Sequence, residues 1–80
     1  MRIRTLLFAT YRDLAGQESL ELELPAGATA ADLVARLRQR PGLNRLPSEP
    51  ALAVNQVYSP LHTELADGDE VALLPPVAGG

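Results

Sequence analysis

The sequence predicts an α+β fold in which a mixed sheet of about five strands carries one main helix across one face. Two segments with alternating apolar residues open the chain, one amphipathic segment with helix start and stop signals follows, and a further alternating segment comes near the end. With 80 residues and no cysteine, the chain makes one small domain whose core forms without disulfides or zinc–thiolate crosslinks.

The first two strands are predicted to form an antiparallel pair. The opening segment "RIRTLLFA" alternates between two faces, and "ESLELEL" alternates more regularly, with its glutamates expected in water. Between them, residues 12–15 are expected to form one helical turn that ends at Gly16. The side chains expected to point inward are Ile3, Thr5, Leu7, Leu20, Leu22 and Leu24, and the opposite face of the first strand carries Arg4, Leu6 and Phe8.

The segment "TAADLVARLRQR" predicts the main helix. Thr29 is followed three residues later by Asp32, which is the spacing of a capping box and places a carboxylate near the positive end of the helix dipole. Arginines enrich the last turns, where cations are favourable, and Pro41-Gly42 is expected to end the helix. The apolar stripe consists of Ala30, Leu33, Val34 and Leu37.

The second half of the chain predicts short strands joined by turns. "GLNRLPSEP" is expected to be irregular, "ALAV" and Val57-Tyr58 are short strands around an "NQ" turn, and "LADGDE" holds a tight turn at Asp67-Gly68. "EVALLP" is the last strand, which Pro75 and Pro76 end. In this element order the last strand commonly runs parallel beside the first, as in the β-grasp, or ubiquitin-like, fold. Residues 1–74 form that domain, and residues 75–80 form a C-terminal segment.

Conventional active sites and several partners are not expected. The formal net charge of −3 argues weakly against nucleic acid, no stretch is long enough to span a membrane, and the short apolar run near the start lacks a signal cleavage site, so we expect a cytoplasmic protein. His62 is interpreted as a surface residue, and Asp67, Asp69 and Glu70 as a solvated turn rather than a calcium loop. We therefore expect no metal, no bound cofactor and no catalytic side chain in the folded body.

The C-terminal segment "LLPPVAGG" carries the chemistry that the body lacks. The two prolines favour an extended path, and residues 75–80 would reach about 18–20 Å at about 3.3 Å per residue. Gly79 and Gly80 have no Cβ, so a narrow channel could admit them and leave the terminal carbonyl accessible. Adenylation would make that carboxylate an electrophile, and a sulfur nucleophile would then give a thiocarboxylate. A frayed terminus or a truncated linker is the alternative interpretation.

Leu6, Phe8 and Leu74 are expected to cluster on the open face of the sheet near the start of this segment. Exposed apolar groups beside a reactive terminus are typical of a docking surface. The alternative is that Phe8, the one phenylalanine of the chain, is half-buried under the connecting loop.

The sequence resembles the small, sulfur-carrying subunits of molybdopterin synthase over nearly its whole length. The similarity lies in "LLFATYRDLAG", "LELPAGATAADLVARL", "LAVNQ" and "LADGDEVALLPPVAGG". The resemblance implies that the Gly80 carboxylate is adenylated by an ATP-using, ubiquitin-activating-like enzyme and receives sulfur from a persulfide donor. It also implies that the sulfur passes to a cyclic pyranopterin monophosphate inside the large synthase subunit, which supplies the catalytic side chains, in a heterotetramer.

By position, the resemblance makes Gly80 the residue that bears the sulfur and Gly79 the residue that gives access to it. Phe8 and Leu74 fall in the contact with the large subunit, although some members have an aromatic residue where this chain has Leu74. The insertion path is lined by Pro75, Pro76, Val77 and Ala78.

Three other functions remain open at this level. A carrier for thiamine or transfer-RNA thiolation ends in the same residues, and a ubiquitin-like protein modifier would use the same glycine. A binding module whose terminal segment does no chemistry is the third, and it would tolerate deletion of Gly80, whereas each carrier would lose all activity. All seven basic residues are arginine, which is interpreted as compositional bias or as the avoidance of amine nucleophiles near a reactive acyl end.

Overall fold

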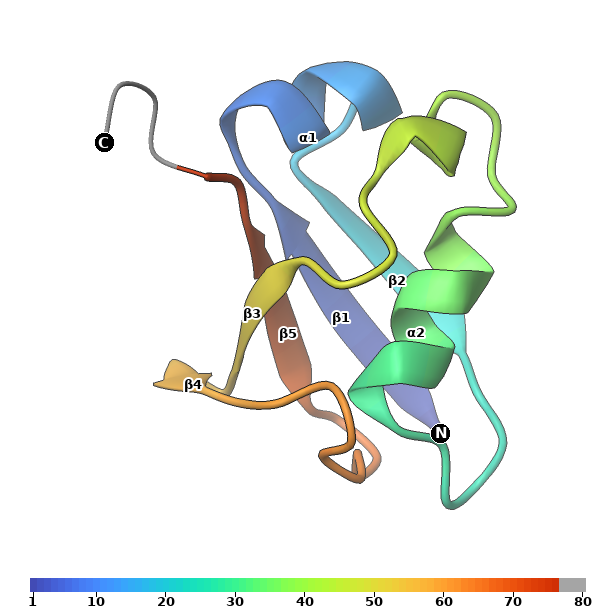
Figure 1. Ribbon diagram of the computed structural model, residues 1–80. Coiled ribbons are helices and arrows are strands. Elements are labelled where there is room, and N and C mark those ends of the chain that lie inside the picture. Colours follow the sequence, from blue (N-terminus) through green and yellow to red (C-terminus); the bar gives the residue numbers. More distant parts are fainter. Residues whose placement is uncertain (77–80) are drawn as a thin grey trace.

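The computed structural model describes residues 1–76 as two layers, a mixed sheet and a helix packed across one of its faces (Figure 1). The sheet of the described residues has five strands in the order β2-β1-β5-β3-β4, with β5 parallel to β1 and the other pairs antiparallel. This arrangement confirms the predicted α+β class and the β-grasp order. The elements are β1 (Arg2–Leu7), α1 (Ala9–Ala15), β2 (Ser19–Glu23), α2 (Ala30–Leu37), η1 (Leu43–Arg45), β3 (Ala51–Val54), β4 (Val57–Tyr58) and β5 (Glu70–Leu74).

The hairpin of β1 and β2 has the register that its apolar alternation requires. Ile3 lies opposite Leu22 and Thr5 lies opposite Leu20, so that all four side chains point toward α2 and are buried. Cross-strand partners share one face of a sheet, and a shift by one residue would have placed these side chains in water. The inward faces predicted for both strands are therefore confirmed.

Helix α2 begins at the predicted capping box. The Thr29 side chain accepts a hydrogen bond from the Asp32 N–H (3.3 Å), and the Asp32 carboxylate accepts one from the Thr29 N–H (2.8 Å). The four residues of the predicted apolar stripe are buried against the sheet. The helix ends at Leu37, earlier than expected, because the next residues tighten into turns in which Arg40 donates to the Leu37 carbonyl.

Helix α1 is longer than the single turn expected at residues 12–15. Phe8 stays extended, and its carbonyl accepts hydrogen bonds from the N–H groups of Tyr11 and Arg12. Tyr11 is the buried residue of this helix, so the sequence has no periodic apolar pattern from which its first turn could be predicted. Its predicted end is confirmed: Gly16 adopts the left-handed conformation, and its N–H donates to the Arg12 carbonyl.

The segment expected to be irregular contains the short helix η1. Leu43 begins this turn, Leu46 follows it, and both are almost completely buried in the core. Gly42 (φ +84°) lies close to the backbone carbonyl of Leu14, which shows that the segment packs directly against α1. The prediction missed this anchoring because two buried leucines three residues apart are too few to establish a period.

Candidate functional site

The face of the sheet opposite α2, here called the open face, has a charged half and an apolar half. The register assigns side chains to it, since partners across the ladder share a face. The charged half carries Arg2, Arg4, Glu21, Glu23 and Glu70, and the apolar half carries Leu6, Ala72, Leu74, Ala51, Ala53 and Tyr58.

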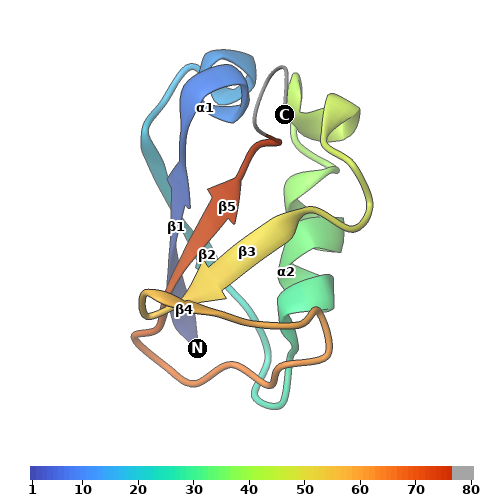
Figure 2. The same ribbon diagram turned by 60° about the vertical axis from the view of Figure 1, so that its left-hand side comes forward.

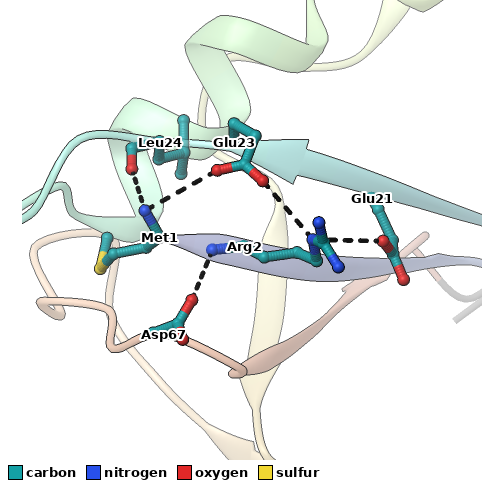
Figure 3. Close-up of polar contacts among 6 residues, drawn as sticks. All are labelled: Met1, Arg2, Glu21, Glu23, Leu24 and Asp67. Carbon is teal, nitrogen blue, oxygen red and sulfur yellow. Dashed lines mark hydrogen bonds and ion pairs between the residues drawn. The ribbon is translucent and has the colours of Figure 1, made fainter.

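Polar contacts within the fold account for the charged half (Figure 3). The Arg2 guanidinium lies 3.5 Å from the Glu23 carboxylate and 3.6 Å from that of Glu21, and the backbone N–H of Arg2 donates to Asp67 at 2.7 Å. The exposed ion pairs link β1 to β2 and contribute little free energy individually, and the hydrogen bond to Asp67 holds the first strand to the turn before β5. Asp67 therefore has a structural role at this end of the sheet.

The remaining acidic groups of the 65–70 turn are also engaged in the fold. Asp69 accepts hydrogen bonds from the Asn55 amide (2.9 Å) and the Ala66 N–H (2.8 Å), and Glu70 lies 4.0 Å from Arg4. Within residues 1–76, no group of three or more His, Cys, Asp or Glu side chains is positioned to hold a metal ion. His62 is exposed in the loop between β4 and β5.

The apolar half lies at the end of the sheet where β5 ends. Leu6 lies beside Ala72, and Leu74 lies beside Ala51, so these small and apolar side chains form a continuous strip across three strands. Tyr58 (79% exposed) borders the strip on β4, and Phe8 (46% exposed) follows Leu6 at the end of β1. Exposed aromatic side chains around an apolar strip are typical of a protein-binding surface.

A hollow of about 430 Å³ lies where β5 passes into the C-terminal segment. Leu74, Pro75 and Pro76 form one side of it, and Pro50 and Tyr58 contribute to the rest of its lining. Buried Tyr11 also reaches this hollow, and its burial raises the pKa of the phenol above the ordinary value. The hollow and the apolar half of the open face therefore meet at Leu74, Pro75 and Tyr58.

The predicted site residues are only partly brought together. Leu74 and Pro75 are half-buried, and Pro76 is exposed beside them. Phe8 lies at the same end of the sheet but lines a separate hollow of about 260 Å³ with Leu6 and Arg12. The other predicted residues, Val77, Ala78, Gly79 and Gly80, lie outside the described residues.

Sequence reasoning missed two contributors to this surface. Tyr58 was assigned to a strand, but its place on the open face follows from its pairing with Ala53 in β3. Ala51 joins the strip through its pairing with Leu74. The "NQ" turn was the signal from which these pairings could have been predicted. Asn55 and Gln56 have positive φ, as a two-residue hairpin turn requires, and the length of such a turn determines which residues of the two strands pair.

Residues 5–80 match the ThiS family. The chain belongs to this family. It is 41% identical to a molybdopterin synthase sulfur carrier subunit of Chlamydomonas reinhardtii, with both chains covered completely. Among solved structures, it is similar to SAMP1 from Haloferax volcanii, with a TM-score of 0.88, 28% identity and full coverage of both chains. It is also similar to a chain of the complex of subunits 1 and 2 of the molybdopterin-converting factor from Helicobacter pylori, with a TM-score of 0.73, 30% identity and full coverage of both.

The similarity agrees with the resemblance noted from the sequence motifs. The similarity to the Chlamydomonas reinhardtii subunit covers the whole domain, including the strands that form the open face. Among the described residues, no helix is both long enough and apolar enough to cross a membrane.

Proposed function

We propose that this ThiS-family chain is the sulfur carrier subunit of a molybdopterin synthase. One observation carries the proposal: the central strand β5 ends beside the apolar half of the open face, and the two prolines there lead directly into residues 77–80. A surface for protein contact thus lies next to the segment that would bear the sulfur. The full-length similarity to sulfur carrier subunits supports the same role.

In the proposed chemistry, a carboxylate oxygen of Gly80 attacks the α-phosphorus of ATP on an activating enzyme, and pyrophosphate leaves. The terminal sulfur of a persulfide then attacks the acyl carbon, AMP leaves, and a thiol reduces the remaining S–S bond with two electrons. The thiocarboxylate on Gly80 is the donor that the large subunit uses on a cyclic pyranopterin monophosphate. In each transfer the sulfur bonds to the pterin precursor, and water then cleaves the acyl C–S bond, which leaves the sulfur on the precursor and returns the Gly80 carboxylate. Two such transfers supply the two sulfur atoms of a dithiolene.

The chain's own contribution is to present the acyl group. Gly79 and Gly80 lack a Cβ, so a narrow channel can admit them, and Pro75, Pro76, Val77 and Ala78 span the distance from the fold. Catalytic side chains and ATP belong to the partner proteins in this proposal. The carrier is therefore a co-substrate that is regenerated rather than a catalyst.

The large subunit is proposed to bind the apolar half of the open face. Leu74 lies at the root of the segment, and Phe8 and Tyr58 are exposed on either side of the strip. The Helicobacter pylori neighbour was solved as a complex of subunits 1 and 2 of its converting factor. We propose that two such carriers flank two large subunits in a heterotetramer.

Neighbouring residues on β4 provide a matched test of this docking surface. Tyr58 points to the open face, whereas Val57 pairs with Val54, which packs toward the core, so Val57 lies on the other side of the strand. Both side chains are largely exposed, and neither substitution by glutamate should unfold the domain. Tyr58→Glu is expected to weaken binding to the large subunit by at least about tenfold, and Val57→Glu by about twofold or less. Equal affinities of the two variants, measured by titration calorimetry, would place the contact elsewhere.

The carrier chemistry itself is tested by the intact mass of the chain after incubation with its host's activating enzyme, ATP and a sulfur source. We expect a gain equal to the replacement of one oxygen by sulfur, and no gain when Gly80 is deleted. The control is a second carrier that shows the activating enzyme to be competent. If the enzyme modifies that carrier but leaves this chain unchanged, the proposal is wrong.

A protein modifier is the second candidate, favoured by the similarity to SAMP1, the small archaeal modifier protein 1 of Haloferax volcanii. In this alternative the activated Gly80 acyl group forms an amide with a lysine of another protein and AMP leaves. Expression of the tagged chain in its host distinguishes the two: a ladder of adducts that depends on Gly80 indicates a modifier. The carrier proposal expects the free thiocarboxylate form instead.

A further inference from the structure

The hollow at the end of β5 holds two polar side chains that are not engaged within the described fold. Tyr11 lines the hollow and is only 5% exposed, and no hydrogen bond joins its hydroxyl to another group of residues 1–76. Glu49 lines it as well, and no cationic group in that range lies within 4.0 Å of the Glu49 carboxylate. A phenol oxygen and a carboxylate are thus both available to accept hydrogen bonds from a group that enters the hollow.

The rest of the lining is mainly apolar and aromatic. Of the described residues that line the hollow, Glu49 alone carries a charge. Tyr58 presents a ring that is 79% exposed where the hollow meets the open face. The walls include four prolines, Pro47, Pro50, Pro75 and Pro76. The hollow therefore combines a negative charge with flat apolar surfaces.

The hollow is continuous with the apolar half of the open face. Ala51, Tyr58 and Leu74 belong to both, and Figure 2 shows that β3 begins at the end of the sheet where β5 finishes. A protein that covers the apolar half therefore also covers the hollow and removes water from Glu49 and Tyr11. Covering an unpaired carboxylate is costly unless the partner supplies a cation that is hydrogen-bonded to it.

A guanidinium satisfies these groups better than any other side chain does. Its N–H groups can donate to the Glu49 carboxylate and the Tyr11 oxygen together, and its planar face can stack on the ring of Tyr58. Its methylene stem can pack against the prolines. An apolar anchor would leave the carboxylate without a partner, an acidic group would meet a like charge, and an ammonium has no flat face to stack.

We propose that the hollow receives an arginine side chain of the large subunit, which donates hydrogen bonds to Glu49 and Tyr11. This inference rests on the proposed carrier function. Because Pro75 and Pro76 form one wall of the hollow, the arginine lies beside the root of the C-terminal segment. The apolar half then provides most of the contact area, and the charged pair fixes the orientation in which the two proteins dock.

Two exposed glutamates provide a matched test of this proposal. Glu49→Gln removes a charge from the hollow, and Glu64→Gln removes the same charge from a loop residue outside its lining. Neither carboxylate forms an ion pair among residues 1–76, so thermal melts are expected to show that both variants fold. Tyr11→Phe removes the hydroxyl and keeps the ring. Titration calorimetry measures the affinity of each variant for the host's large subunit.

We expect Glu49→Gln to weaken this binding by at least about tenfold and Glu64→Gln to change it by about twofold or less. Tyr11→Phe should weaken it by about three- to tenfold, as the loss of one hydrogen bond to a charged group does. The effect of Glu49→Gln should persist near 0.5 M salt, because a pair that is covered from solvent is screened much less than an exposed one.

A double-mutant cycle identifies the occupant. Arginines and lysines on the carrier-binding face of the large subunit are replaced by glutamine one at a time, and each variant is titrated with the wild-type carrier and with Glu49→Gln. We expect one arginine whose replacement weakens binding to the wild-type carrier at least about fivefold more than binding to the Glu49→Gln carrier.

Several outcomes would overturn the proposal. Coupling to a lysine would replace the arginine, and unchanged or tighter binding of Glu49→Gln would indicate an apolar occupant. A loss of affinity only toward the activating enzyme would assign the hollow to that protein. Each of these results leaves the carrier function intact. A wild-type chain that neither binds the large subunit nor gains sulfur would reject the carrier function, and this inference with it.

Discussion

Replacing Gly42 by alanine is expected to destabilise the fold more than replacing Gly27, although the two backbones are alike. Gly42 has φ +84° and Gly27 has φ +89°, so each substitution forces an alanine into the left-handed region. A Cβ at Gly42 would lie 2.5 Å from the carbonyl oxygen of Leu14, whereas a Cβ at Gly27 would have no neighbour within 4 Å. The comparison therefore isolates the close packing of the η1 segment against α1.

The expected magnitudes follow from these two terms. The left-handed conformation costs about 1–2 kcal/mol for alanine at either position. Gly42→Ala must also displace a backbone carbonyl, and overpacking of this kind typically adds about 1–3 kcal/mol. For a domain of this size, each kcal/mol lowers the Tm by about 4–8 °C. The Gly42→Ala protein should consequently melt at least about 4 °C below the Gly27→Ala protein.

Thermal melts followed by circular dichroism, together with urea titrations, measure this difference. The urea midpoints should fall in the same order, with similar slopes if both native states stay compact. Equal stabilities within about 0.5 kcal/mol would refute the argument, since they would mean that α1 and the η1 segment move apart at little cost.

Two further predictions concern buried groups. Thr5 is completely buried, and its hydroxyl has no hydrogen-bond partner among the described residues, so Thr5→Val is expected to raise the free energy of unfolding by about 1 kcal/mol. Thr10→Val, at an exposed position, is the control with a change within about 0.5 kcal/mol, and an unchanged urea midpoint for Thr5→Val would contradict the reasoning. Burial raises the pKa of Tyr11 above its ordinary value of about 10, so the stability that its neutral form contributes is present below that pH and is lost as the pH rises through the folded-state pKa. Stability measured from pH 9 to about 11 should fall more steeply for the wild type than for Tyr11→Phe, and identical slopes would show that this phenol is not responsible.

The elements with a regular pattern could be predicted from the chain alone. The alternation of Leu20, Leu22 and Leu24 assigned the inward face of β2, and the spacing of Thr29 and Asp32 located the start of α2. Each of these signals depends on neighbours within one element. Side-chain burial produces a periodic apolar pattern, and a capping hydrogen bond requires two residue types at a fixed spacing. The chemical role of Gly79 and Gly80 stays a prediction, since these residues lie outside the described part of the chain.

Close approaches between distant segments could not be predicted in this way. The first turn of α1 and the burial of Leu43 depend on packing across the chain, which a single buried residue does not reveal. The separate hollows of Phe8 and Leu74, which were expected to form one cluster, depend on how α1 leaves β1.

The sequence by itself determined the fold class, the inward faces of the strands and the limits of the main helix to within a turn. The tertiary structure decided that Tyr58 joins the open face and that Pro47 and Pro50 line the same hollow as Pro75 and Pro76. The reason is that periodicity records whether a side chain is covered, whereas the register of a ladder and the packing of one segment on another record what covers it.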